Sequence, residues 1–338
     1  MDIGLFMPTH GLPTRDERDA FLQPIPAGEM RPVEVAQRAE RLGYHSVWIA
    51  DHVVMERVTP NPHPANVSGT RVYPDQPVML DPLTTMAAVA AGTKTIKVAT
   101  SVLIAPYRPP LTVAHAFATI DVLSQGRVIV GIGSGWEQSE FRAVGASYED
   151  RGPVTEECIE VYKVAWTQPW LEYHGRFSEF RDVSLEPKPV QKPHPPIVYG
   201  AVTKPGARRA ARTADALYPM FLDTYVDPAR FEPLRDEILQ EAERIGRDVS
   251  GFEWLAFASA LVTDASDEMA QRDPRPTLTG TAEQILADLE RFAACRYSHV
   301  TVFFDVRSGT MSEYLEIVER FAEEVVPAAA KIEARPFA

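Results

Sequence analysis

The fold of this chain is decided by residues 96–136, which open with IKVATSVLIAP (96–106) and close with RVIVGIGSGW (127–136). Both ends are apolar and rich in β-branched residues, which is typical of strands, and they flank a helical pattern that begins after Pro109-Pro110 and stops at Gly126. The stretch therefore predicts a strand–helix–strand crossover. Because backbone donors stay free at the carboxyl edge of parallel strands, we expect the functional site at that edge.

Composition narrows the classes of partner. The chain of 338 residues has a formal net charge of −13, so it lacks the basic surface that a nucleic acid or an anionic membrane requires. Cys158 and Cys295 are too few and too far apart for a disulfide framework or a zinc ribbon, and no metal-ligand motif occurs. The first residues indicate a strand rather than a secretion signal, and no stretch is long and apolar enough to span a membrane. We expect a cytoplasmic protein without a metal, acting on a small-molecule substrate.

Strand and helix patterns alternate along the whole chain. The predicted strands are residues 3–7, 45–50, 96–106, 127–136, 196–201, 216–220, 252–262 and 299–304. The predicted helices are residues 32–42, 82–91, 110–126, 151–166, 205–213, 228–245, 282–293 and 312–326. Eight strands separated by helices predict an α/β fold, a (β/α)8 TIM barrel with inserted segments, as a single domain over residues 1–338.

Two irregular segments interrupt this pattern as rim insertions. Residues 53–80 are rich in proline and follow the second strand, so they are expected at the carboxyl rim as a lid; the alternative is a passive surface loop. Residues 170–195 contain Tyr173-His174-Gly175-Arg176-Phe177, which predicts a small structural hairpin.

Three strand ends carry the candidate chemistry. Asp51-His52 ends the second strand, where a histidine can hold or move a proton near neutrality, although the pair could also merely begin a turn. The run Gly131-Ile132-Gly133-Ser134-Gly135 departs from the dinucleotide-binding fingerprint, because Trp136 occupies the place of the third glycine. Its glycines either pack against neighbouring backbone or admit a flat ligand. Residues 200–209 form a strand end, a small-residue turn and a helix start, which suits a phosphate but also resembles an ordinary turn.

Several motifs in order resemble the bacterial luciferase-like family, and most closely its branch that uses the deazaflavin coenzyme F420. They are WIADHVV (48–54), LDPL (80–83), VATSVL (98–103), DVLSQGR (121–127), GIGSGW (131–136) and PPIVYG (195–200). The resemblance implies a (β/α)8 barrel that holds the deazaflavin at its carboxyl mouth. It also implies a cis peptide bond between Ser101 and Val102, in a bulge behind the ring.

The same resemblance implies roles for individual residues. Asp51 would contact the ring or the ribityl chain, while His52 would face the substrate as proton donor or acceptor. Gly135, Trp136 and Ser139 would line the ring and the ribityl chain, and Gly200, Ala201 and Thr203 would receive the phosphate. The implied reaction is hydride transfer between F420 and a small organic substrate.

Two departures from the family pattern bear on specificity. The phosphate turn has Gly200-Ala201 where a Gly-Gly pair is common, and Trp136 stands where sugar-phosphate dehydrogenases of the branch have a glutamate. A large indole argues against glucose 6-phosphate and favours an apolar or aromatic substrate, or it packs the mouth. The alternatives are a two-component monooxygenase that uses reduced FMN and a catalytically silent flavin-binding protein. A homodimer is expected from the frequency of dimers in the family.

Overall fold

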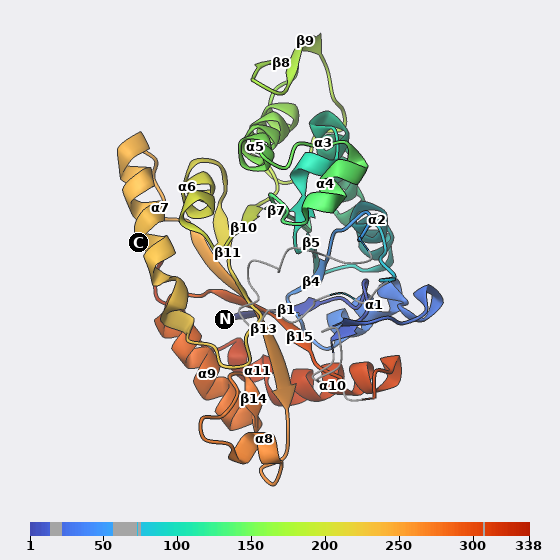
Figure 1. Ribbon diagram of the computed structural model, residues 1–338, viewed down its shortest axis with the longest axis vertical. Coiled ribbons are helices and arrows are strands. Elements are labelled where there is room, and N and C mark those ends of the chain that lie inside the picture. The colour runs from blue at the N-terminus through green and yellow to red at the C-terminus, as the bar shows by residue number, and fades with distance from the viewer. Residues whose placement is uncertain (14–21, 57–72, 74–75, 307) are drawn as a thin grey trace.

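The computed structural model describes residues 1–13, 22–56, 73, 76–306 and 308–338. Within these residues, 8 parallel strands close into a barrel, because β10 pairs with β7 and β15 pairs with β1 (Figure 1). In order around the barrel they are β1 (Asp2–Phe6), β4 (Ser46–Ile49), β5 (Lys97–Thr100), β7 (Val128–Gly133), β10 (Ile197–Gly200), β11 (Ala216–Tyr218), β13 (Glu253–Val262) and β15 (His299–Phe304). The predicted (β/α)8 TIM barrel is confirmed.

Helices form a layer around the strands (Figure 1). They are α1 (Pro32–Arg41), α2 (Pro82–Gly92), α3 (Pro110–Ser124), α4 (Gln138–Val144), α5 (Arg151–Thr167), α6 (Lys204–Thr213), α7 (Glu232–Ile245), α8 (Glu268–Gln271), α9 (Ala282–Ala294), α10 (Met311–Glu324) and α11 (Val326–Ala329). Local chemistry sets their ends. The Asp81 side chain accepts a hydrogen bond from the Thr84 backbone at 2.8 Å and starts α2. At the end of α3, Gln125 and Gly126 have φ of 59° and 85°, so the helix stops where Gly126 predicts.

Apolar side chains also fill the interior of the barrel. This inner layer includes Phe6, Trp48, Tyr218, Phe257 and Phe303, and the Trp48 ring stacks on that of Tyr218 with centroids 4.9 Å apart. The layer separates the carboxyl ends of the strands, which we call the mouth, from their amino ends, which we call the floor.

Two predicted strands prove to be interrupted. The run 96–106 was expected as one strand, but pairing stops after β5 and resumes at β6 (Leu103–Ile104), with Ser101 and Val102 between them. The run 216–220 likewise divides into β11 and β12 (Met220–Phe221). Apolar residues continue through both breaks, so periodicity alone does not reveal them.

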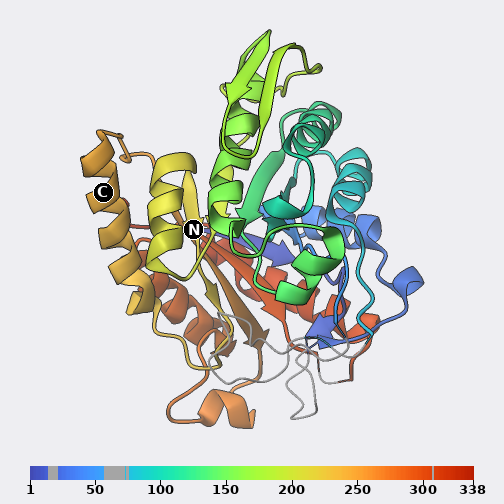
Figure 2. The same cartoon turned by 45° about the horizontal axis from the view of Figure 1, so that its top comes forward.

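The rim segments are only partly described. The expected hairpin is formed by β8 (Leu171–His174) and β9 (Glu179–Val183), which project from the barrel (Figure 2). Residues 57–72 and 74–75 of the expected lid lie outside the described residues. No helix in the described part of the chain has the length and apolar character to cross a membrane.

Candidate functional site

A cavity of about 590 Å³ opens at the mouth of the barrel. Its lining includes these residues singled out in the sequence: Asp51, His52, Ser101, Val102, Gly135, Trp136, Gly200, Ala201 and Thr203. They come from the ends of β4, β5, β7 and β10, so the topology brings four distant sequence segments to one site. Ser139 is not part of this lining.

His52 is held by a buried carboxylate that the sequence did not reveal. Its Nδ1 lies 2.7 Å from Oε2 of Glu140, whose side chain is fully buried. An ionised carboxylate only accepts hydrogen bonds, so a proton of the imidazole sits on Nδ1, and Nε2 makes no hydrogen bond to a described residue. Burial raises the pKa of the Glu140 carboxyl, but the hydrogen bonds from His52 and Val53 outweigh it and hold this pKa below its usual range.

Glu140 also organises the backbone around His52. Its Oε1 accepts hydrogen bonds from the backbone of Val53 and Val54, and its Oε2 accepts one from the Tyr107 hydroxyl at 2.8 Å. Glu140 lies on α4, 88 residues from its histidine. The only sequence signal was its place four residues after Trp136, which was not enough to identify it.

The Asp51 carboxylate forms hydrogen bonds and an ion pair within the protein. Both carboxylate oxygens bind the Arg108 guanidinium, at 2.6 and 2.8 Å, and Oδ2 accepts a further hydrogen bond from the Ile104 backbone at 2.9 Å. A bidentate arginine pair fixes both partners in one geometry. Asp51 therefore anchors the chain just beyond the interruption between β5 and β6, while it also lines the cavity.

That interruption forms part of the cavity wall. The Ser101-Val102 peptide bond is cis, as the resemblance implied, and the Ser101 hydroxyl donates to Tyr218 at 3.2 Å. A Cβ on Gly133 would lie 2.4 Å from Cγ2 of Val102, and one on Gly200 would lie 2.8 Å from Cγ1. Both glycines thus make room for Val102, and for Gly133 this favours the packing interpretation of the glycine run over direct approach of a ligand.

Aromatic rings and a second histidine surround His52. The Tyr73 and Trp136 rings meet it edge to face, with centroids 5.1 and 6.1 Å away. His10 also lines the cavity, and its buried Nδ1 has no hydrogen-bond partner among the described residues. Burial, and secondarily the charge of His52, lower the pKa of His10 to about 3, so its ring is neutral near neutrality. Sequence reasoning missed His10 because it follows the first strand without a motif.

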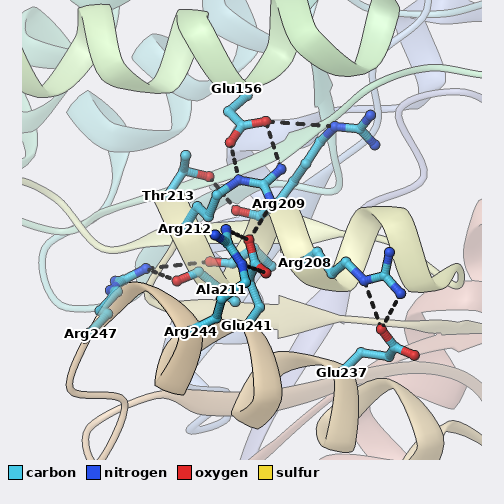
Figure 3. Close-up of polar contacts among 11 residues, drawn as sticks. Glu156, Arg208, Arg209, Ala211, Arg212, Thr213, Glu237, Glu241, Arg244 and Arg247 are labelled. Carbon is cyan, nitrogen blue, oxygen red and sulfur yellow. Dashed lines mark hydrogen bonds and ion pairs between the residues drawn. The ribbon is translucent and has the colours of Figure 1, made fainter.

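The start of α6 also lines the cavity. Thr203 is the N-cap of this helix and accepts a hydrogen bond from the Gly206 backbone at 3.4 Å. Among the arginines of α6, Arg212 pairs with Glu156 and Glu241, and Arg208 pairs with Glu237 (Figure 3).

Arg209 differs from these neighbours because it lines the cavity. Its Nε lies 3.9 Å from Glu156 and is buried without a hydrogen-bond partner in the described part of the chain (Figure 3). A helix start with an unsatisfied guanidinium nitrogen fits an anionic group such as a phosphate.

Ser139 lies in the first turn of α4, outside the cavity lining. Its hydroxyl donates to Oε1 of Glu137 at 2.8 Å, and its backbone donates to the same oxygen at 3.2 Å. Glu137 is the N-cap of α4, so Ser139 helps to fix the helix that carries Glu140.

The chain is similar in sequence to one protein family and to several of its curated relatives. Residues 1–299 match the family model described as luciferase-like monooxygenase. An uncharacterized protein of Mycobacterium tuberculosis is 34% identical over 221 residues, which cover 64% of this chain and 75% of that protein. An F420-dependent glucose-6-phosphate dehydrogenase of Amycolatopsis mediterranei is 32% identical over 225 residues, covering 64% of this chain and 61% of its own length. An FMNH2-dependent dimethylsulfone monooxygenase of Pseudomonas putida is 39% identical over 131 residues, covering 38% and 36%.

Solved structures share the fold at lower identity. A monooxygenase from Streptomyces bottropensis superposes with a TM-score of 0.73 at 20% identity, covering 97% of this chain and 99% of its own. An F420-dependent secondary alcohol dehydrogenase gives a TM-score of 0.69 at 20% identity, covering 97% and 98%. The relatives therefore include proteins that depend on F420 and proteins that depend on FMN.

Proposed function

The chain belongs to the luciferase-like monooxygenase family, and we propose that it is an oxidoreductase that transfers a hydride between coenzyme F420 and a small organic substrate. The observation that carries this proposal is the pair of His52 and Glu140 at the mouth. It puts one oriented ring nitrogen beside a cavity large enough for a flat cofactor.

The described residues fit a cofactor with a flat ring and a phosphate. Val102 would support the ring, and Gly135 and Trp136 would lie beside it. Gly200, Ala201 and Thr203 would hold the phosphate with Arg209, whose buried Nε makes no hydrogen bond to any described residue. When bound, a deazaflavin gives or accepts a hydride at its C5 carbon.

The chain would contribute orientation and proton handling. Glu140 fixes the tautomer of His52, so Nε2 can give a proton to the substrate or take one from it. Asp51 is proposed to act near the ring through the backbone that it anchors, because Arg108 occupies both of its oxygens. The Tyr73 and Trp136 rings beside His52 would limit the access of water to the bound molecules.

The two relatives point to different cofactors, at 32% identity for the F420-dependent one and 39% for the FMNH2-dependent one, and we base the proposal of F420 on the longer alignment. The F420-dependent relative aligns with 64% of this chain, whereas the FMNH2-dependent one aligns with 38%. The second candidate, a monooxygenase that uses reduced FMN, is favoured by the surface charge: Glu237 pairs with Lys204 and Arg208, which reduces the positive charge available to the acidic tail of F420.

A fluorescence titration with F420 and with FMN tests the choice. We expect saturable F420 binding and much weaker FMN binding; tight FMN binding without F420 binding would reverse the assignment. Arg209→Gln should weaken binding of the preferred cofactor by about tenfold or more, since a hydrogen bond to a charged group contributes about 1.5–3 kcal/mol. Arg208→Gln is the matched control on the same helix and should leave the affinity close to that of the unaltered protein.

A test of His52 follows the same design. His52→Asn should lower turnover while cofactor affinity stays close to the original value, because the proposed role is proton transfer rather than cofactor binding. A large loss of affinity in this variant would count against that role.

A further inference from the structure

The floor of the barrel carries a second cluster of chemically capable side chains, far from the cavity. Asp2 begins β1, His299 begins β15, and these two residues are direct partners in the parallel register of the two strands. His45 precedes β4, and its backbone donates to Ile3 of β1 at 2.9 Å. Three adjacent strands thus bring together positions 2, 45 and 299.

The side chains of Asp2, His45 and His299, which we call the floor cluster, point toward one another. Nε2 of His45 lies 3.2 Å from Oδ2 of Asp2, and the centroids of the two imidazole rings are 5.4 Å apart. One nitrogen from each histidine and one oxygen of Asp2 all lie within 4.8 Å of one another. We propose that Asp2, His45 and His299 form a binding site for a dication of the zinc class.

The chemistry of the donors selects this class of ion. Two imidazoles and one carboxylate suit zinc and cobalt, whereas calcium and magnesium require oxygen ligands throughout. Three protein ligands leave a position for water, and the side chain of Asp2, 56% exposed, keeps that position open to solvent.

Two further observations fit a ligand at this place. Nδ1 of His45 is buried without a hydrogen-bond partner in the described ranges. Nε2 of His299 lies 3.1 Å from the Thr301 hydroxyl, which orients that ring as outer-shell groups orient metal ligands.

Neighbouring charges affect how tightly the proposed site would bind a dication. Lys97 is near enough to lower the pKa of both histidines, and it would oppose a dication. Glu253 lies near Lys97 and Asp2 and offsets part of that charge. The site therefore binds more weakly than a closed structural zinc site, and Lys97→Gln should strengthen it.

The proposal is tested with Co²⁺, whose visible absorption reports tetrahedral coordination by nitrogen and oxygen. Full-length protein without a purification tag is freed of metal with a chelator and titrated. We expect one equivalent to bind. Asp2→Asn and His45→Ala should each weaken binding by more than the roughly 10- to 100-fold that loss of an outer-shell partner costs. Zn²⁺ should displace Co²⁺ and raise the thermal midpoint of the unaltered protein.

His174→Ala is the matched control, because His174 lies between Glu172 and Glu179 on the exposed hairpin at 3.1 and 3.5 Å. This variant should bind as the unaltered protein does. Asp2 is half-exposed, so Asp2→Asn keeps the test informative if His45→Ala fails to fold. Absence of Co²⁺ absorption in the unaltered protein, or absorption that persists unchanged in Asp2→Asn, overturns the proposal.

Discussion

At the mouth of the barrel, the Glu140 carboxylate is fully buried and accepts hydrogen bonds from His52, Tyr107 and two backbone groups. At the floor, the Asp2 carboxylate is 56% exposed and pairs with His45. Both ends therefore combine a histidine with a carboxylate. We call the pair at the mouth a closed set, because its carboxylate is buried among hydrogen-bond donors, and such a set fixes the position of one proton and suits catalysis. The pair at the floor is an open set, because its carboxylate is exposed, and it leaves room for an ion.

The largest expected effect comes from breaking the closed set. Glu140→Ala would leave His52, Tyr107 and the backbone of Val53 and Val54 without their acceptor, so we expect a loss of about 3–5 kcal/mol in the free energy of unfolding. Asp2→Ala should change it by no more than about 1 kcal/mol, as is usual for exposed pairs. Urea denaturation in the presence of a chelator measures both. Equal losses would show that the two carboxylates do not differ in this way.

Acid should destabilise the mouth through His10. Its pKa is about 3 in the folded protein, below the ordinary value of 6.5, so the unfolded chain binds a proton first as pH falls. The stability is fully present above pH 6.5 and decreases below it. Between pH 7 and pH 5 the free energy of unfolding should fall by about 2 kcal/mol, at 1.36 kcal/mol per pKa unit.

His10→Phe tests this dependence. Phenylalanine keeps an aromatic ring against Phe6, whose centroid lies 4.9 Å away, but it cannot be protonated. The variant should therefore lose less stability than the unaltered protein between pH 7 and pH 5, as measured by urea denaturation at each pH. Parallel pH profiles would contradict a neutral, buried His10.

A smaller effect is expected where the mouth depends on close packing. In Gly200→Ala, the new Cβ would lie 2.8 Å from Val102, so we expect a loss of about 1–3 kcal/mol and weaker F420 binding. Gly251→Ala is the control, because nothing lies within 4 Å of its Cβ position, and it should change stability by about 0.5 kcal/mol or less. Unchanged F420 binding in Gly200→Ala would contradict the proposal that Val102 supports the cofactor ring.

The smallest effect is expected for Ser139→Ala. The hydroxyl bonds to Glu137 and does not line the cavity, so about 1 kcal/mol of stability and little F420 affinity should be lost. Isothermal titration with F420 measures the affinity. A loss of about tenfold, or 1.4 kcal/mol, would instead support the ribityl contact that the sequence resemblance implied.

Sequence patterns revealed nine residues of the cavity lining because these residues lie at strand ends or just beyond them. The apolar runs located the strands; Asp51, His52 and Gly135 follow a strand, and Gly200 is the last residue of one. The barrel then requires these positions to meet. The barrel was predictable because strand and helix signals are local, and eight strands that alternate with helices are typical of this fold.

Partners that tertiary structure supplies were not predictable. Glu140 and Arg108 reach His52 and Asp51 from 88 and 57 residues away, and nothing in their local sequence specifies these contacts. The floor site that we propose would follow the same rule, because no metal was expected from a sequence without compact ligand motifs. Positions 2, 45 and 299 share no spacing that such a motif could contain.

The pairing of β1 with β15 also has a consequence for biosynthesis. Asp2 lies opposite His299, so the first strand of the barrel acquires this neighbour only after almost 300 further residues have been translated. At about 5–20 residues per second, that takes roughly 15–60 s on the ribosome. During this interval β1 has at least one free edge, which nascent-chain chaperones could cover until β15 emerges.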